Sequence, residues 1–85
     1  MVQAMERKVE LNVLKPSAWE REFEERRKSL LSDGYIERVA WRTSALYMCI
    51  LRHRTNGNKV SLKAYPSSRT VIQTTNGYLK YIATF

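Results

Sequence analysis

Positively charged residues follow one another along the second half of the chain with no acidic residue among them. All eight Asp and Glu residues lie at or before Glu37, whereas residues 38–85 contain eight Lys and Arg. Charge of one sign favours a polyanionic partner, because several cations can neutralise phosphates together. An exposed tyrosine can add stacking on an unpaired base. The candidate nucleic-acid-binding residues are Arg52, Arg54, Lys59, Lys63, Tyr65, Arg69 and Lys80.

His53 is the residue most suited to catalysis. It lies between Arg52 and Arg54, and a histidine among cations could act as general acid or base in a ribonuclease toxin. Alternation along a strand directs it away from both arginines, and the sequence offers neither a second histidine nor a nearby carboxylate. We therefore expect a non-enzymatic protein in which His53 packs close to a turn.

The remaining chemistry-bearing residues predict no bound cofactor and no metal. The sequence holds no Gly-rich phosphate loop, carboxylate pair, nucleophile motif or metal-ligand spacing. Its single cysteine, Cys49, lies in the apolar stretch ALYMCIL, where we expect a buried, reduced thiol. This expectation suits the cytoplasm or another reducing intracellular compartment. Apolar runs far shorter than the roughly 20 residues of a membrane helix, and an N-terminus without an apolar signal segment, predict no membrane partner.

Two Asn-Gly pairs should position the cations. Asn56-Gly57 and Asn76-Gly77 are each flanked by β-forming residues, which is the strongest short-range signal for a hairpin. A two-residue loop at Asn56-Gly57 would pair Arg54 with Lys59 and fix the register. One face would then collect Cys49, Leu51, Val60, Leu62 and Ala64. The other face would collect Arg52, Arg54, Lys59, Lys63 and Tyr65.

The second hairpin, by the same rule, pairs Gln73 with Lys80. Its basic face would carry Arg69, Gln73 and Lys80. Its apolar face would carry Ile72, Leu79, Tyr81, Ala83 and Phe85. If both apolar faces lie under one helix, the cations form a continuous basic surface on the outside of the sheet.

The helix that covers this sheet is predicted after Pro16 and ends before Gly34. Ser17 and Glu20 have the spacing of a capping box, and Gly34 is suited to the left-handed turn after a helix. Its apolar stripe is Trp19, Phe23, Leu30 and Leu31, and its expected ion pairs are Glu22–Arg26 and Glu24–Lys28.

The remaining segments read as strands. Residues 7–15 alternate like a half-buried strand, and the segments YIERVAW and ALYMCIL read as two further strands joined by a turn at residues 43–44. ALYMCIL is apolar on both faces and is predicted to be central and covered. We expect a single domain, residues 1–85, of the α+β class: a small antiparallel sheet in the order β-α-β-β-β-β-β with one helix packed on one face.

Three functions fit these features, and a ribonuclease toxin with His53 as its catalytic residue ranks third among them. The first is a small non-enzymatic module that binds RNA or single-stranded DNA on a basic sheet face, although the aromatic motif of RNP-type domains is missing. The alternative is a small inhibitor or adaptor, of the kind that viruses or plasmids encode, docking its basic face on an acidic partner protein. The C-terminal strand NGYLKYIATF is apolar on both faces, so it is a candidate either for homodimer pairing or for burial under the helix.

Overall fold

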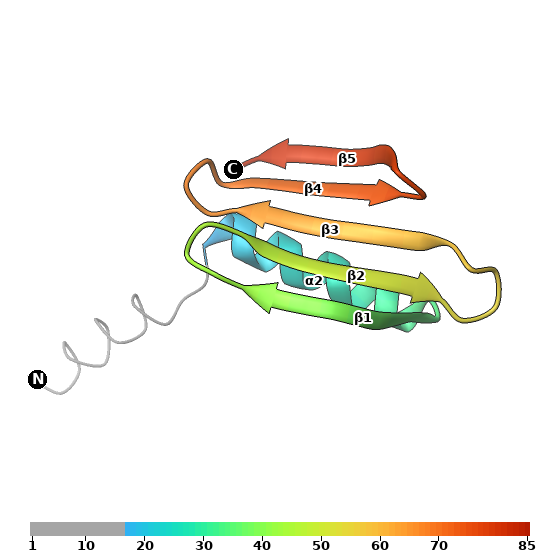
Figure 1. Ribbon diagram of the computed structural model, residues 1–85. Helices are drawn as coiled ribbons and strands as arrows, with labels where there is room; N and C mark the ends of the chain where they lie inside the picture. The colour runs from blue at the N-terminus through green and yellow to red at the C-terminus, as the bar shows by residue number, and fades with distance from the viewer. Residues whose placement is uncertain (1–16) are drawn as a thin grey trace, which may run out of the picture.

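The computed structural model describes residues 17–85, which form one helix and a five-stranded antiparallel sheet (Figure 1). The elements are α2 (Ala18–Ser32), β1 (Tyr35–Arg42), β2 (Tyr47–His53), β3 (Lys59–Tyr65), β4 (Thr70–Thr75) and β5 (Tyr78–Thr84). The strands lie in the sheet in chain order, β1-β2-β3-β4-β5. The predicted α+β class with one helix on an antiparallel meander is thus confirmed. The predicted strand at 7–15 lies outside the described residues.

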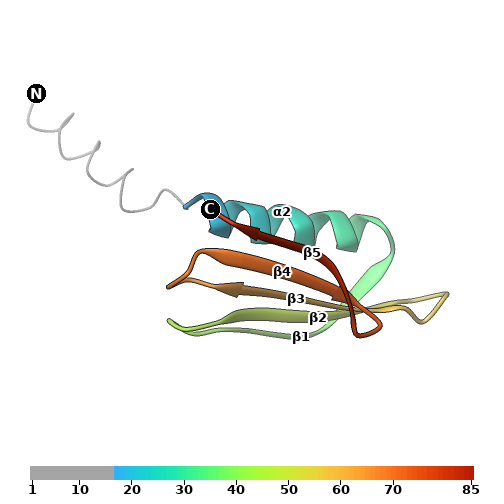
Figure 2. The ribbon, with the colours of Figure 1, turned by 90° about the horizontal axis from the view of Figure 1, so that it is seen from above.

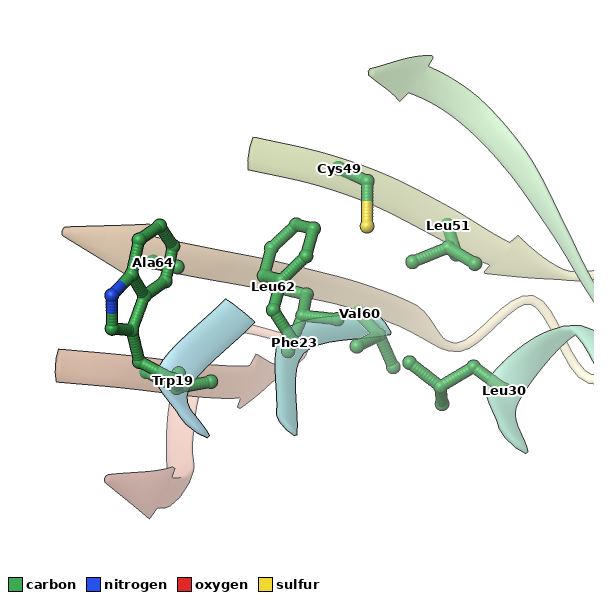
Figure 3. Packing of buried hydrophobic residues seen from close by; sticks show 9 residues of the cluster. Trp19, Phe23, Leu30, Cys49, Leu51, Val60, Leu62 and Ala64 are labelled. Atoms are coloured by element: carbon green, nitrogen blue, oxygen red, sulfur yellow. The ribbon is translucent and has the colours of Figure 1, made fainter. Parts of the chain in front are cut away.

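The helix packs along one face of the sheet, and in the part of the chain that the structure describes no element covers the opposite face (Figure 2). Trp19, Phe23 and Leu30 point from α2 towards the strands (Figure 3). The buried strand residues that receive them are Cys49, Leu51, Val60, Leu62, Ala64 and Val71. Leu31, which the stripe also predicted to be buried, is 38% exposed, so the helix buries a narrower stripe than expected.

The helix begins and ends at the predicted residues, but its start is stabilised differently. Ser17 occupies the N-cap position with an extended backbone, yet its side chain makes no capping hydrogen bond. The capping-box prediction is therefore wrong: the Glu20 carboxylate instead accepts a hydrogen bond from the Tyr47 hydroxyl at 3.3 Å. At the other end, Gly34 follows the helix with a φ of +98°, as predicted.

Ion pairs hold the charged side chains of α2 against the helix and the sheet. Arg26 Nε pairs with Glu22 at 2.7 Å, as predicted. Glu24 does not pair with Lys28, because Arg27 and Arg42 compete for it, the latter from β1. Arg27 also donates two hydrogen bonds to Glu37 of β1, at 2.7 and 2.8 Å. The arginines in these pairs are thus occupied on the helix side of the sheet.

The two Asn-Gly turns both close hairpins, but only one has the predicted length. Asn76 and Gly77 have φ angles of 52° and 84°, and Thr75 pairs with Tyr78 across a two-residue loop. The first hairpin has a longer loop, residues 54–57, and the backbone N–H of His53 donates to the Asn58 carbonyl at 2.8 Å. The predicted pairing of Arg54 with Lys59 is therefore wrong.

In the first hairpin Lys59 pairs with Arg52, two positions from the expected partner. The physical reason is the His53 ring, whose Nδ1 accepts hydrogen bonds from the Thr55 and Asn56 backbone N–H groups and organises a wider loop. Because side chains alternate with a period of two, a shift of two residues returns each side chain to the same face. The predicted faces of β2 and β3 are therefore unchanged.

The faces of β4 were predicted wrongly. Pro66–Arg69 form the loop before it, and Tyr65 pairs with Thr70, so Val71 shares the buried face with Ala64. Ile72 consequently lies on the opposite face. Gln73 lies on the helix side, where its side-chain oxygen accepts a hydrogen bond from Arg26 at 3.1 Å.

In β5 the register changes between Thr74–Leu79 and Gln73–Tyr81, so that Lys80 is an extra residue in a bulge. The predicted pairing of Gln73 with Lys80 is wrong for this reason. Leu79 lies before the bulge and pairs with Thr74, which faces away from the helix, so Leu79 also lies on that face, contrary to prediction. Beyond the bulge, Tyr81 and Ala83 face the helix side as expected.

Candidate nucleic-acid interface

The face of the sheet away from α2, hereafter the open face, is built from four rows of side chains that cross the strands. The row nearest the Asn-Gly turns contains Ile36, Arg52 and Lys59. The next contains Val39, Ile50, Ser61, Thr74 and Leu79, and the third contains Trp41, Met48, Lys63, Ile72 and Ile82. The last contains Tyr65, Thr70 and Thr84.

Two cations face each other directly at the turn end of the open face. Arg52 and Lys59 are cross-strand partners, and Arg52 Nη1 donates to the Gly57 carbonyl at 3.3 Å. Like charges directly opposite each other destabilise a sheet. Among residues 17–85 no carboxylate lies within 4.0 Å of either side chain. The fold therefore tolerates a repulsive pair at a position where an anion could neutralise it.

A third cation lies near the centre of the open face. Lys63 is half-buried between its cross-strand neighbours Met48 and Ile72. A lysine in such a position packs its aliphatic stem on apolar neighbours and keeps its ammonium group in solvent. Lys63 thus combines an apolar contact with an available positive charge.

The acidic residues of the described part lie in α2, at its C-cap or on the helix side of β1. They are Glu20, Glu22, Glu24, Glu25, Asp33 and Glu37. The hydrogen bonds and ion pairs of Glu37 with Arg27 lower the pKa of its carboxyl group, and contacts with Arg26 and Tyr81 outweigh desolvation in lowering that of Glu22. Glu22 and Glu37 therefore stay ionised at neutral pH, and the acidic side chains of the described part lie away from the opposite face.

Large apolar side chains are exposed beside the cations. The exposed fraction is 54% for Trp41, 58% for Leu79 and 57% for Ile82. Ile36 and Val39 of β1 are also exposed on the open face. Trp41 is an interface candidate that the sequence reasoning missed, since an exposed indole offers a larger stacking surface than a tyrosine.

A β-bulge explains why Trp41 faces outward. The register of β1 shifts between Glu37 and Val39, which leaves Arg38 as an extra residue. Glu37 before the bulge faces the helix, whereas Val39 and Trp41 after it face outward. Strict alternation would have placed all three on one face, so the bulge creates the exposed aromatic position.

The structure brings four of the seven predicted site residues together on the open face: Arg52, Lys59, Lys63 and Tyr65. Arg54 lies in the loop after β2, Arg69 lies in the turn before β4 with a φ of 54°, and Lys80 lies in the bulge of the edge strand β5. The predicted continuous basic face is therefore wrong. The open face instead combines cations, exposed apolar groups and hydroxyl groups. The segment ALYMCIL, predicted to be covered on both faces, forms most of β2, and the described residues cover β2 only on its helix side.

His53 has a structural position on the helix side. Its Nε2 lies 2.9 Å from the Asp33 carbonyl oxygen, and its Nδ1 lies 3.1 Å from the Thr55 hydroxyl and also faces backbone N–H groups of the loop. Nδ1 thus accepts hydrogen bonds from the loop, and Nε2 donates to the Asp33 carbonyl oxygen. The imidazole ring also packs edge-on against the Tyr35 ring, with 4.9 Å between the two ring centroids. His53 thereby links the end of the helix to the β2–β3 loop, with both ring nitrogens engaged.

The remaining candidates for a reactive or metal-binding site in the described part are the thiol of Cys49 and the possible metal ligands. Cys49 is buried, and burial, reinforced by the nearby Glu37 charge, raises the pKa of its thiol to about 12. The expectation of a buried thiol is confirmed. Within residues 17–85 no three His, Cys, Asp or Glu residues lie close enough together to hold a metal ion.

A hollow of about 430 Å³ opens between the two Asn-Gly turns at the Arg52–Lys59 end of the open face. At its rim, Asn76 joins the two hairpins through side-chain hydrogen bonds. The Asn76 side-chain oxygen accepts from the Lys59 backbone N–H at 2.9 Å, and its side-chain nitrogen donates to the Asn58 side chain at 3.1 Å. The hollow is therefore held by hydrogen bonds that do not depend on a ligand.

Comparison of the chain with protein families, with curated proteins and with solved structures finds no match. The helix of residues 17–85 is too short and too polar to cross a membrane.

Proposed function

We propose that the protein is a non-enzymatic module that binds single-stranded nucleic acid, RNA or DNA, on the open face. The observation that carries the proposal is the separation of charge, with the described acids on the helix side and Arg52, Lys59 and Lys63 on the open face. Cations on a flat surface neutralise phosphates without reading base sequence. Binding should therefore depend strongly on salt and only weakly on sequence.

Two aromatic side chains of the open face, the exposed Trp41 and the half-buried Tyr65, suit unpaired bases. Trp41 and Tyr65 lie in neighbouring rows of the open face and can each present a ring to a base. Five strands at about 4.8 Å spacing make a sheet about 19 Å wide, wider than the ~12 Å major groove of B-form DNA. A single strand can lie flat on such a surface, whereas a duplex would meet it only along one ridge of its backbone.

The test is the affinity of the protein for labelled oligonucleotides of equal length, measured by fluorescence anisotropy. Single-stranded RNA or DNA should bind more tightly than duplex. The substitutions Arg52→Gln and Lys59→Gln should weaken binding similarly for unrelated sequences. Arg21→Gln and Lys28→Gln remove exposed helix cations and are the matched controls, because Arg26 and Arg27 make ion pairs that help to hold the fold.

The second candidate is an inhibitor or adaptor that docks the open face on an acidic partner protein. The exposed Ile36, Val39, Leu79 and Ile82 favour it, because protein interfaces combine an apolar centre with a charged rim. Single-stranded nucleic acid is preferred because the apolar rows contain an exposed indole and a central lysine. Failure of the wild-type protein to bind any oligonucleotide at low salt would favour the protein partner instead.

Pairing of the C-terminal strand with a second copy also stays a prediction. β5 is an edge strand, and its outward Leu79 and Ile82 are exposed. Lys80, in the bulge, discourages edge pairing, since a bulge and a lysine both interrupt the addition of another strand.

A further inference from the structure

We propose that the hollow between the two Asn-Gly turns binds a terminal phosphate of the strand that lies on the open face. This inference rests on the proposed function and adds to it a preference for one kind of strand end. The ligand is a phosphomonoester on a nucleotide, at either the 5′ or the 3′ end. The alternative ligand of the hollow is an internal phosphodiester, and the charge of the hollow favours the phosphomonoester over it.

The charge of the hollow supports this choice. Arg52 and Lys59 line it, and none of the lining residues is acidic. A phosphomonoester carries a charge of about −1.5 to −2 at pH 7, whereas a phosphodiester carries −1. The pair of cations therefore balances a terminal phosphate more completely. Its binding would also relieve the cross-strand repulsion between Arg52 and Lys59.

The neutral groups of the hollow suit the same ligand. Ser61 and Thr74, which are cross-strand partners, present hydroxyl groups that can donate to phosphate oxygens. Gly57 and Gly77 line the rim, and a Cβ added at either glycine would meet no atom within 4 Å, so the approach is open. A volume of about 430 Å³ holds more than an ion and suits a phosphate with part of its sugar.

The position of the hollow determines the path of the bound nucleic-acid strand over the sheet. It lies at one end of the open face, and Lys59 and Tyr65 are six residues apart along β3, about 20 Å at roughly 3.3 Å per residue. This length accommodates about six stacked nucleotides at ~3.4 Å each, or fewer if the strand is stretched. A strand anchored in the hollow would therefore pass Lys63 and end near Tyr65.

The experiment compares three oligonucleotides of one sequence of six nucleotides, bearing a 5′-phosphate, a 3′-phosphate or no terminal phosphate; the unphosphorylated one is made with the label at either end, which gives four labelled strands. In each phosphorylated strand the fluorescent label is at the end opposite the phosphate. The affinity of that strand, measured by anisotropy, is compared with that of the unphosphorylated strand whose label is at the same terminus. The wild-type protein should bind one phosphorylated strand about tenfold more tightly than its unphosphorylated counterpart, because charge-assisted hydrogen bonds are lost with the phosphate. The arm that shows the preference identifies the end.

Variants separate the hollow from the rest of the open face. Lys59→Gln should reduce the preference for the phosphorylated strand to below threefold. Thr74→Val removes a hydroxyl group and should reduce the preference by a smaller factor, and valine favours a strand as threonine does. Lys63→Gln removes the same charge outside the hollow, so it should weaken binding of every strand and leave the preference intact. Thermal unfolding of each variant checks that the fold is kept.

Each outcome distinguishes the two proposals. Equal affinity for all three oligonucleotides would overturn the terminal-phosphate site and leave single-strand binding standing. A preference that survives Lys59→Gln and Thr74→Val would overturn the assignment to the hollow. No binding of any oligonucleotide by the wild-type protein would overturn the proposed function and this inference together.

Discussion

Removing the like-charged pair at the turn end of the open face should stabilise the protein while weakening its binding. Arg52 and Lys59 are cross-strand partners without a carboxylate within 4.0 Å among residues 17–85. For two unit charges at about 7 Å, a separation typical of long side chains on neighbouring strands, the repulsion is about 0.6 kcal/mol in water at low salt. At an ionic strength of about 0.15 M the Debye length is ~8 Å, so less than half of that remains. Lys59→Gln should therefore raise the free energy of unfolding by several tenths of a kcal/mol at low salt.

Urea denaturation at about 0.01 M and 0.5 M salt tests this reasoning. The difference between Lys59→Gln and wild type should be largest at low salt and should nearly vanish at high salt. Lys80→Gln is the control, because Lys80 lies in the bulge of β5 and has no cation as its cross-strand partner. The explanation fails if Lys59→Gln destabilises the protein at low salt, or if both variants respond to salt equally.

Three further outcomes follow from the same structure. His53→Ala should lower the free energy of unfolding by about 2 kcal/mol, because loop and helix-end hydrogen bonds are lost, with oligonucleotide affinity nearly unchanged; RNA cleavage abolished by this substitution would contradict the non-catalytic role. Trp41→Ala should cost about 1–3 kcal/mol of single-strand binding without changing its salt dependence, since stacking releases no counterions; an unchanged affinity would remove Trp41 from the interface. The pKa of Cys49 is raised from 9.0 to about 12, so its stabilising contribution is complete below pH 9 and is lost as pH rises towards 12. Urea titrations from pH 8 to 11 should therefore show stability falling more steeply in wild type than in Cys49→Ala, and parallel curves would contradict this burial.

The local sequence pattern predicted the helix, the five strands of residues 35–84 and most of the core. Trp19, Phe23 and Leu30 have helical spacing, and the two Asn-Gly pairs mark turns, so the helix and both hairpins could be located. The faces of β2 and β3 were right despite a wrong register, because the error was two residues and side chains alternate with a period of two.

What could not be predicted depends on single extra residues and on contacts between distant elements. Val71 and Ile72 are adjacent apolar residues, so alternation cannot choose which is buried until the preceding loop sets the register. The bulge at Arg38 turns Trp41 outward, and the bulge at Lys80 re-aims the rest of β5. The long first loop depends on hydrogen bonds to the His53 ring. None of these features has a signal in the local pattern of the sequence.

The central claim is that the open face binds single-stranded nucleic acid. The salt dependence of this binding tests the claim most directly. Affinity for one unstructured oligonucleotide should be measured across a range of salt concentrations for wild type, for Arg52→Gln combined with Lys59→Gln, and for Arg21→Gln combined with Lys28→Gln. If each open-face cation neutralises one phosphate, the first double variant should reduce the salt slope by about two units and the helix variant should barely change it. Equal effects of the two double variants, or no binding by wild type at low salt, would contradict the assignment of nucleic acid to the open face.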